Sequence, residues 1–302
     1  MILLSIIIVN HNSKKLLRDC LKSIFQNIKD IDFEILVVDN ASLDESLEMI
    51  RSEFSEIKVI INKENFGFAR ANNQAIKKAE GKYILLLNPD TIILDKNFKK
   101  FIKFMEEHSE VKACGPLVLN SDKTMQRQCK RGLTTFWNSF TYYSGLWRLF
   151  SQNKWWRKKF GGYFLLNKPD DEICEVDNLS GAAMMVKREI LEKVGLMCED
   201  YVMYWEDIDW CFRIKQAGWK ICYFPSTKII HYGGAGGTQL HIFKNLWYFH
   251  KGACLFYKRY LASNYFFLSN FLYYSGIWIA FSLKLLSNLF RKEKTIGSKK
   301  PS

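Results

Sequence analysis

Short runs of consecutive apolar residues alternate with longer segments whose apolar residues recur every three or four positions. The continuous runs are rich in β-branched residues and lie at 3–9, 33–38, 58–61 and 83–87. Such runs are typical of strands that are covered on both faces. The segments between them have helical spacing and predict helices over 17–28, 44–54 and 70–79. Strands that alternate with helices predict βαβ units, hence an α/β fold with a mostly parallel, right-handed sheet.

The same rhythm continues, with one interruption, as far as residue 230. A helix is expected over about 98–105 and a strand over 111–114. From residue 120 to about 177 the pattern is irregular. It then resumes with a helix over 188–194, a helix from near Glu206 that Gly218 closes, and strands over 219–224 and 228–230.

The stretch 82–91, KYILLLNPDT, reads as a fully buried strand that ends in a turn. Pro89 ends the strand because proline has no N–H to donate and a fixed φ. Asp90 therefore follows the carboxyl end of a central strand, which is where open α/β sheets bind their ligands. A carboxylate there can hold a divalent cation, and that cation a diphosphate. Asn88-Pro89-Asp90 is also ordinary turn chemistry, so the motif alone leaves both readings open.

Three acidic residues and a histidine are further candidates for chemistry. Glu206, Asp207 and Asp209 come directly after a run of aromatic residues, in the first turn of an expected helix. Acidic side chains there complement the helix dipole, but three of them exceed what capping needs. His231 ends the last strand before a glycine-rich loop, and imidazole at such a position is a candidate metal ligand.

Two regions are rich in aromatic and basic residues. The irregular segment 120–177 interleaves Arg and Lys with Trp and Tyr, which suits stacking on bases or sugars, a membrane interface, or ordinary packing of an insertion. Residues 264–283 contain no charge, and a basic tail at 291–294 follows. Their length would just span a bilayer, but their polar residues favour helices that lie on an anionic leaflet. A single span and packing against the rest of the protein are the alternatives.

Composition narrows the class of protein. The 302 residues carry 44 Lys and Arg against 31 Asp and Glu, a net charge of +13 that indicates an anionic partner such as a nucleotide diphosphate, a lipid surface or nucleic acid. The eight cysteines have no metal-binding spacing and are expected to be reduced thiols in the cytosol. The first nine residues lack a basic flank and a cleavage site, so no signal peptide is expected. The first loop has no G-x-G-x-x-G, which disfavours a nicotinamide or flavin site.

Six stretches, in order along residues 4–237, resemble glycosyltransferase family 2, the inverting enzymes, and in particular its bacterial rhamnosyltransferase-like branch. They are SIIIVNHNS, VVDNASLDES, NFGFARANNQAIKKAEGKYILLLNPDT, VDNLSGAAMMVKREILEKVG, YVMYWEDIDWCFRIKQAGWKICYFP and IIHYGG. The resemblance implies a GT-A fold, a nucleotide-sugar donor and a divalent metal, Mg²⁺ or Mn²⁺. It implies a GT-A domain over 1–240, with a donor half at about 1–118, an insertion at about 120–176 and an acceptor half at about 177–240. From their composition, residues 241–302 are expected to form a helical, membrane-associating appendage.

The resemblance also assigns roles to individual residues. The assigned donor-binding residues are Asn10, Asp39, Asn65, Arg70, Asn88 and Asp90. Asp39 would contact the base, and Asn88 stands where many relatives have the first aspartate of an Asp-x-Asp motif. Asp90 and His231 would hold the metal, and Asp207 would be the general base. Gly181, Trp205 and Glu206 would lie on the acceptor side. Met197-Cys198-Glu199-Asp200 departs from the Phe-Asp-Glu that many relatives carry.

The expected function is inverting transfer of a sugar, with dTDP-rhamnose as donor and a lipid-linked saccharide as acceptor, in cell-surface polysaccharide synthesis. The expected location is the inner face of a bacterial plasma membrane, at an anionic lipid surface. Two alternatives are a catalytically inactive binding protein of the same fold and a sugar nucleotidyltransferase. The first predicts a lost carboxylate, and the second a basic glycine-rich loop after the first strand; neither is present. A nucleic-acid partner is not expected, because it would explain the charge but not the carboxylates.

Overall fold

The computed structural model describes residues 2–149, 152–233 and 242–290. Most of the glycine-rich loop after His231 and the basic tail at 291–294, both singled out in the sequence, lie outside the described residues. The chain forms two compact units, each built from segments that are separate in sequence. The first unit comprises residues 1–130, 170–202 and 206–237, and the second comprises 131–169, 203–205 and 238–302.

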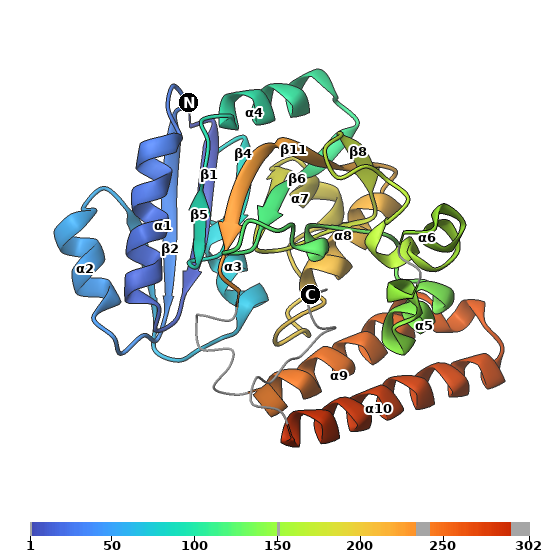
Figure 1. Ribbon diagram of the computed structural model, residues 1–302. Coiled ribbons are helices and arrows are strands. Elements are labelled where there is room, and N and C mark those ends of the chain that lie inside the picture. Colours follow the sequence, from blue (N-terminus) through green and yellow to red (C-terminus); the bar gives the residue numbers. More distant parts are fainter. Residues whose placement is uncertain (1, 150–151, 234–241, 291–302) are drawn as a thin grey trace. The chain divides into compact units, whose positions relative to one another are not determined.

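A central sheet organises the first unit (Figure 1). Its strand order is β3-β2-β1-β4-β10-β6-β11-β5, with β8 paired to β11. The strands are β1 (Leu4–Asn10), β2 (Phe33–Asn40), β3 (Lys58–Asn62), β4 (Tyr83–Leu87), β5 (Thr91–Ile93), β6 (Val111–Leu119), β8 (Cys174–Val176), β10 (Ala183–Lys187) and β11 (Lys220–His231). The expected α/β fold with a central sheet is confirmed.

The parallel arrangement predicted for the sheet holds in two places. Strands β3, β2, β1 and β4 are parallel to one another, and β11 is parallel to β6. Between them, β10 runs antiparallel to both β4 and β6, and β5 and β8 run antiparallel to β11. Because β10 is reversed, the residues that precede it lie at the same sheet edge as the residues that follow β4.

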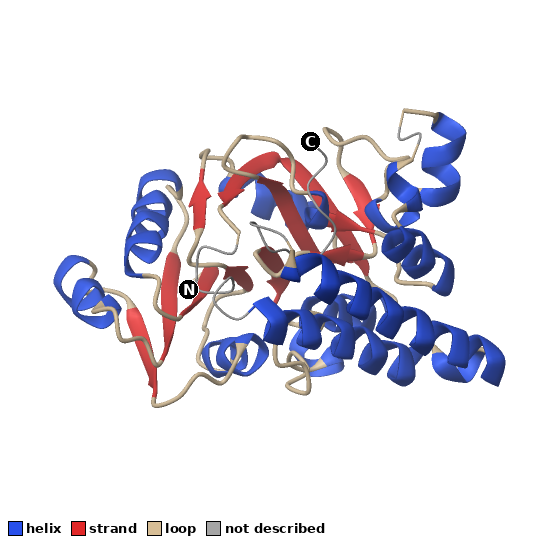
Figure 2. Cartoon of the chain, turned by 60° about the horizontal axis from the view of Figure 1, so that its bottom comes forward, coloured by secondary structure: helices blue, strands red, loops and turns tan. Residues whose placement is uncertain are grey.

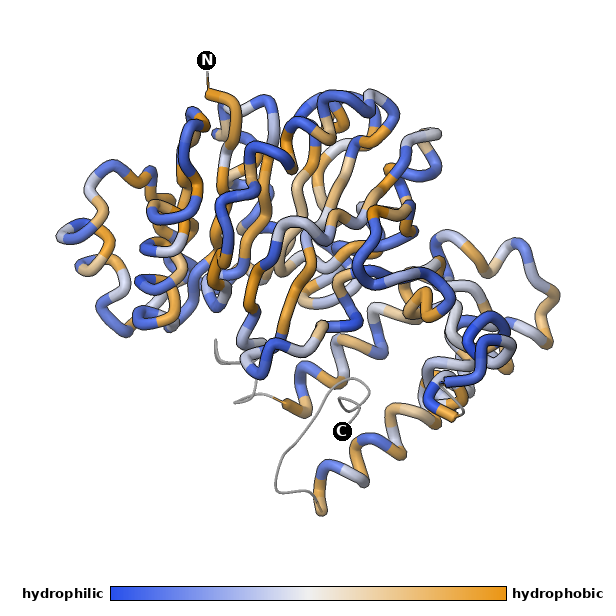
Figure 3. Tube along the Cα trace, turned by 45° about the horizontal axis from the view of Figure 1, so that its top comes forward, coloured by the Kyte–Doolittle hydropathy of each residue, from blue (hydrophilic) through white to orange (hydrophobic). Residues whose placement is uncertain are grey.

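Helices cover this sheet (Figure 2). They are α1 (Lys14–Asn27), α2 (Ser46–Glu53), α3 (Phe68–Ile76), α4 (Phe98–Glu107), α7 (Ile190–Val194) and α8 (Glu206–Gln216). Helix α3 packs on β1 and β2, α4 on β6 and β11, and α8 on β11. All five residues of β4 are buried, as its apolar run predicts. Figure 3 shows the strands of the sheet mostly in the hydrophobic colour, which agrees with a core built on these runs.

Two expected elements differ in extent from the sequence analysis. Residues 219–224 and 228–230, predicted as two strands, form the single strand β11, which crosses Pro225 with a register shift against β6 between Phe224 and Lys228. A bulge there absorbs the residue that cannot donate to the ladder. Strand β6 likewise continues past the predicted residue 114 to Leu119.

The segment predicted to be irregular contains regular structure, most of it in the second unit. Its helices are α5 (Phe136–Ser144) and α6 (Lys154–Phe160), with 3₁₀ turns η1 (Arg127–Cys129), η2 (Leu146–Arg148) and η3 (Gly162–Phe164). The short strands β7 (Lys130–Arg131) and β9 (Asn178–Leu179) flank them. Trp147, Tyr163, Phe164 and Leu166 form a buried cluster there. The sequence analysis did not predict these elements. Their buried positions are largely aromatic, so the segment lacks the aliphatic periodicity from which the other helices were predicted.

Two long helices complete the second unit, α9 (Ile242–Tyr260) and α10 (Phe267–Leu289), joined through the 3₁₀ turn η4 (Ala262–Asn264). Helix α10 packs on α9 and on α5. The rings of Tyr257 and Tyr273 stack with their centroids 3.7 Å apart, and Trp247 packs on Trp278 at 4.9 Å. Among the described residues, no helix joins sufficient length to sufficient apolarity to cross a membrane.

Candidate active site

Most of the predicted site residues lie at one edge of the sheet in the first unit. Asn10 and Asp39 end β1 and β2 and are directly opposite each other in the parallel register. Asn88 follows β4, and its N–H donates to the carbonyl of Ala182, just before β10 (2.9 Å). His231 ends β11 opposite Thr91. The topology therefore gathers side chains from four separate stretches of the sequence.

Asp39 and Asn10 form a buried polar corner at this edge. The Asp39 carboxylate accepts a hydrogen bond from the backbone N–H of Ser42 at 2.9 Å and one from Asn10 Nδ2 at 3.1 Å. Asn10 Nδ2 also donates to Ser42 Oγ at 3.0 Å. Asn10 Oδ1 is buried and accepts no hydrogen bond from any residue that the structure describes. A buried acceptor of this kind calls for a donor, which a ligand can supply.

The neighbouring Asn40 organises the loop that contains Asn65, and the sequence analysis missed it. Its Nδ2 donates to Asn65 Oδ1 at 2.8 Å, and its Oδ1 accepts from Asn62 Nδ2 at 3.0 Å and from the N–H of Phe66 at 3.1 Å. An asparagine directly after Asp39 at the end of a strand was the available signal. Arg70, in α3 after this loop, is exposed and lies over the ring of Phe66, 4.1 Å from its centroid.

Asp90 and His231 meet at the second corner. His231 Nε2 lies 3.2 Å from Asp90 Oδ1 and 3.2 Å from Asn88 Nδ2. On the other side of the ring, Nδ1 lies 3.0 Å from Gln126 Oε1, while Gln126 Nε2 donates to the His231 carbonyl at 2.6 Å. An amide oxygen only accepts, so Nδ1 carries the proton and Nε2 presents a lone pair in neutral His231. The sequence offered no signal for Gln126, which lies in the segment predicted to be irregular.

This corner fits a divalent cation. Two acceptors, a carboxylate oxygen and an imidazole lone pair, face each other at 3.2 Å and would repel without a proton or a cation between them. Within the described ranges, no three His, Cys, Asp or Glu side chains gather as a metal cage. Substrate phosphates and water commonly complete the shell of a Mg²⁺ ion that a protein holds through a single carboxylate, and Asp90 offers such a carboxylate.

Cys20 packs against the turn that follows β4. Its Sγ lies 3.4 Å from Thr91 Oγ1 and 3.7 Å from the Asn88 carbonyl. Burial raises the pKa of the Cys20 thiol to about 12.

Asp207 occupies a third corner, in the first turn of α8. Its Oδ2 accepts from the N–H of Gly181 at 3.1 Å and its Oδ1 from the N–H of Ile208 at 2.8 Å. A Cβ atom at Gly181 would lie 3.2 Å from the ring of Phe68, so glycine allows the backbone here to lie close to that ring. Because Ala182 is hydrogen-bonded to Asn88, only a few residues separate Asp207 from the Asp90–His231 corner.

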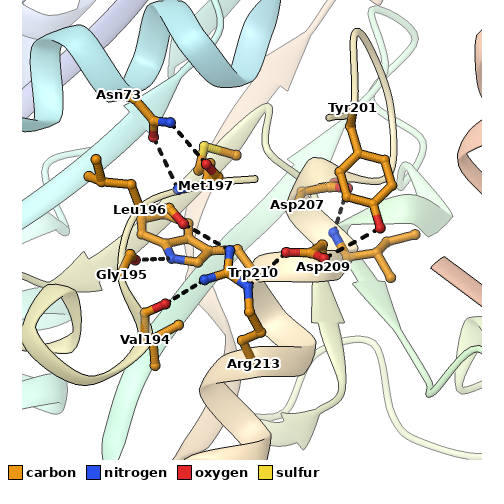
Figure 4. Close-up of polar contacts among 11 residues, drawn as sticks. Asn73, Val194, Gly195, Leu196, Met197, Tyr201, Asp207, Asp209, Trp210 and Arg213 are labelled. Atoms are coloured by element: carbon orange, nitrogen blue, oxygen red, sulfur yellow. Dashed lines mark hydrogen bonds and ion pairs between the residues drawn. The ribbon is translucent and has the colours of Figure 1, made fainter. Parts of the chain in front are cut away.

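The third acid of the cluster, Asp209, has a structural role (Figure 4). Its buried carboxylate pairs with Arg213 Nε at 2.8 Å and accepts from the Tyr201 hydroxyl at 3.3 Å. Arg213 also donates to the carbonyls of Val194 and Leu196. Trp210 Nε1 donates to the carbonyl of Gly195 at 3.0 Å. Helix α8 thus anchors the loop after α7, and Asp207 is left at the other side of its first turn.

Glu206 is buried, and Trp205, the preceding residue, belongs to the second unit. The Trp205 indole N–H donates to the carbonyl of Phe249 at 2.8 Å, and its ring packs on Phe249 and Phe256. Only 3% of Trp205 is exposed. Both Tyr204 and Trp205 have positive φ, of 67° and 74°, a strained conformation for non-glycine residues. The chain therefore enters α8 through a strained turn that is packed against α9.

Comparison with known proteins connects this geometry to a family. Residues 5–195 match the model described as Glycosyl transferase family 2. The chain is 29% identical over 238 residues to the rhamnosyltransferase WbbL of Escherichia coli, covering 75% of this chain and 82% of that protein. It is 24% identical over 232 residues to the low-salt glycan biosynthesis hexosyltransferase Agl10 of Haloferax volcanii, covering 76% of this chain and 66% of that protein. For the N-acetylglucosaminyl-diphospho-decaprenol L-rhamnosyltransferase of Mycobacterium tuberculosis, identity is 22% and each chain is covered to 66%.

Two solved structures share the fold. The mannosyltransferase PcManGT from Pyrobaculum calidifontis, solved with GDP-Man and Mn²⁺, has a TM-score of 0.55 at 17% identity. The alignment covers 94% of this chain and 75% of that one. GalNAc-T7, solved with UDP, GalNAc and Mn²⁺, has a TM-score of 0.56 at 16% identity, covering 76% of this chain and 43% of that one.

Proposed function

Because the chain belongs to glycosyl transferase family 2 and has a GT-A fold, we propose that it is an inverting glycosyltransferase that uses a nucleotide-sugar donor. The observation that carries the proposal is the continuity of the site. Asp207 and Asp90 are connected through the backbone of Gly181 and Ala182 and that of Asn88. This connection supports Asp207 as the base and Asp90 as the metal-binding carboxylate at one edge of the sheet. Inverting transfer needs these two functions on opposite sides of the reacting carbon.

The donor would bind along the corners of Asp39 and Asp90. We propose that the base of the nucleotide binds at Asp39, whose carboxylate is held by Asn10 Nδ2 and the N–H of Ser42. Asn10 Oδ1, which accepts no hydrogen bond from the described residues, would be a further acceptor. Asn88 would contact the ribose, and Asn65 and Arg70 would line the pocket. Asp90 and His231 would hold Mg²⁺ or Mn²⁺, which when bound offsets the charge of the departing diphosphate.

On the acceptor side, Asp207 would take the proton of the acceptor hydroxyl. The hydroxyl oxygen would bond to the anomeric carbon of the donor sugar while the bond from that carbon to the diphosphate breaks. Help of this kind from a positioned base contributes about 10²–10⁴-fold. The N–H groups of Gly181 and Ile208 hold the carboxylate in place. Glu206 and Gly181 would border the acceptor, and buried Trp205 would act by fixing the entry into α8.

For the finer identity, we propose rhamnose from dTDP-rhamnose as the donor sugar and a lipid-linked saccharide as the acceptor, in cell-surface polysaccharide synthesis. Support comes from the names of the E. coli and M. tuberculosis relatives. An acceptor carried on a lipid also places the enzyme at a membrane surface, which we propose to be the inner, anionic face of the plasma membrane.

Thermal unfolding with a panel of nucleotide diphosphates and their sugars, with and without Mn²⁺, tests the proposal. A ligand that binds only the native state raises the melting temperature by mass action. We expect a Mn²⁺-dependent rise with dTDP-rhamnose that exceeds the rise with UDP- or GDP-sugars. A rise with one of those sugars instead would reassign the donor. No rise with any nucleotide, with or without Mn²⁺, would contradict the proposed function.

A further inference from the structure

The charge of this protein is divided unequally between its two units. The first unit carries 27 Lys and Arg against 30 Asp and Glu, whereas the second carries 17 against one, Glu293. The segments 131–169, 203–205 and 238–290 contain no acidic residue. The whole net positive charge therefore belongs to the second unit, and the unit that contains the candidate active site is slightly acidic.

On α9, three of these cations form a row. Lys244, Lys251 and Lys258 are spaced by seven residues, and all three are exposed. Seven residues are close to two helical turns, so the three side chains share one face of the helix. Trp247, on the same face, packs against Trp278 of α10. The row therefore runs beside the contact between the two helices.

Helix α10 presents an apolar stripe to solvent along its whole length, about 34 Å for its 23 residues. Its inner face holds Tyr273 and Ile277, which are buried. Its only charged residue is Lys284. A shallow groove on α10 is lined by Ser275, Trp278, Ile279, Ser282 and Leu283. The stripe consists of side chains that are each more than half exposed: Leu268, Phe271, Leu272, Ile279, Leu283, Leu286 and Leu289.

We infer that α9 and α10 form a docking surface for an anionic phospholipid bilayer, with the α10 stripe in the interface and the α9 lysines at the headgroups. An apolar stripe of this size marks an interaction site, and cations beside it complement anionic lipid. A second copy of the chain fits less well, because a symmetric contact would bring the lysine rows together, and residues 238–290 contain no acidic side chain to pair them. A nucleic acid would not cover the stripe.

Sedimentation with lipid vesicles tests the surface on the full-length protein, without nucleotide. We expect binding to phosphatidylcholine vesicles that contain phosphatidylglycerol, and much weaker binding to pure phosphatidylcholine. Lys244→Gln/Lys251→Gln/Lys258→Gln should weaken binding to the anionic vesicles by roughly a hundredfold, about fivefold for each lysine. The matched control, Lys22→Gln/Lys99→Gln/Lys100→Gln, removes three exposed lysines from the first unit and should leave binding unchanged. Arginine at the three α9 positions should restore it.

Leu272→Gln/Leu283→Gln should weaken binding to both kinds of vesicle, whereas Leu43→Gln/Leu94→Gln, at exposed positions of the first unit, should not. Failure of the unmodified protein to sediment with anionic vesicles would overturn the inference. So would equal binding by the α9 triple variant and its control. A dimer in solution that the α10 variant dissociates, with vesicle binding unchanged, would assign the stripe to a second copy. These results do not depend on activity, so the proposed transfer reaction stands or falls separately.

A different observation supports a second inference, which rests on the proposed metal site. Gln126 contacts both the ring and the carbonyl of His231, at 3.0 and 2.6 Å, and its own backbone N–H is fixed to the Val118 carbonyl of β6. We propose that Gln126 is a positioning residue that fixes the rotation and tautomer of His231, so that Nε2 faces the cation. Outer partners of a ligating histidine typically change metal affinity by about 10–100-fold.

Mn²⁺ affinity, measured by electron paramagnetic resonance, tests this role without turnover. Gln126→Leu should lower the affinity about 10–100-fold and weaken the imidazole nitrogen signal in pulsed spectra. Gln126→Glu, which still accepts from Nδ1–H, should recover most of the loss, and Gln128→Leu, at a nearby exposed position, should behave as the unmodified protein. Unchanged Mn²⁺ affinity in Gln126→Leu would overturn the inference. An unmodified protein that binds no Mn²⁺ would instead contradict the metal site itself.

Discussion

At the scale of single residues, Asp207 and Asp209 lie in the same turn of α8 but differ in their surroundings. The Asp207 carboxylate accepts hydrogen bonds from the backbone N–H groups of Gly181 and Ile208, which orient it. Asp209, two positions on, is buried against Arg213 and Tyr201. The first arrangement suits a group that accepts a proton, and the second suits one that stabilises the fold.

Paired substitutions separate these duties. Asp207→Asn should lower turnover by about 10²–10⁴-fold and leave both the melting temperature and the nucleotide-induced stabilisation nearly unchanged. Asp209→Asn should instead destabilise the protein by about 1.5–3 kcal/mol, because it removes a charged hydrogen-bond partner of Arg213. Turnover assays and thermal unfolding of both variants provide the measurement. Near-normal turnover of Asp207→Asn would exclude it as the base.

At the scale of elements, the loop between β3 and α3 is closed by a glycine. Gly67 has a φ of 79° and begins α3, and a Cβ there would lie 2.6 Å from the carbonyl oxygen of Val202. Gly195 has a similar conformation, φ 75° and ψ −169°, but open space around it. The two glycines therefore have the same backbone requirement and different surroundings.

Alanine substitutions at the two glycines measure how much the contact of Gly67 with Val202 contributes beyond the backbone requirement that both glycines share. Gly195→Ala should cost about 1–3 kcal/mol through backbone strain alone. Gly67→Ala should cost more, because Val202 must also move, and it should weaken nucleotide binding through the displaced Asn65 loop. Denaturant unfolding and nucleotide titrations check both effects. Equal destabilisation by the two substitutions would show that the Val202 contact has no energetic importance.

The packing of α9 on α10 predicts a dependence of stability on pH. Burial lowers the pKa of His250, against the hydrogen bond that its Nδ1 makes to Leu246, and Lys284 lowers it further. Below about pH 6.5, His250 binds a proton more readily in the unfolded chain than in the folded protein. The free energy of unfolding therefore falls as pH falls. His250→Gln should flatten the slope of melting temperature between about pH 5 and 7. An unchanged slope would assign the acid sensitivity to other groups.

How much the sequence could predict differs from element to element. The placement of Asp39, Asp90 and His231 at one edge of the sheet was predictable because each ends an apolar run, and strand ends define the edge where ligands bind. Their chemical roles stay predictions. Gln126 and Asn40 were not, because their roles come from hydrogen bonds between segments distant in sequence. The Asp209–Arg213 pair has the i, i+4 spacing of a helical ion pair, so its structural role was available to inspection and was overlooked. The reversal of β10 leaves no mark in local periodicity, since an antiparallel strand buried on both faces is as apolar as a parallel one.

At the scale of the whole molecule, none of the eight cysteines forms a disulfide, and all eight lie in the described residues. Five are buried, and burial raises the pKa of Cys129, Cys222 and Cys254 to about 11. Cys174 and Cys198 are partly exposed. The thiols therefore report on opening of the whole fold.

A thiol-specific chromogenic reagent should titrate two cysteines quickly in the native protein and all eight in denaturant. The remaining six should react at the rate of unfolding, because the thiolate is the reactive form and burial suppresses it. Replacement of Cys174 and Cys198 by serine should abolish the fast phase. A fast phase that persists in this variant would show that one of the buried sites opens without unfolding.

The chain passes from one unit to the other five times, after residues 130, 169, 202, 205 and 237. One of these exchanges separates Trp205 from Glu206, directly before the proposed base. No single cut can therefore divide the protein into a catalytic fragment and a basic fragment, and a gene fusion cannot transplant either one as a cassette. With the proposed roles, a truncation or fusion that removes the lipid-binding unit also disrupts the unit that carries the transfer site, so the two activities cannot be separated by cutting the chain once.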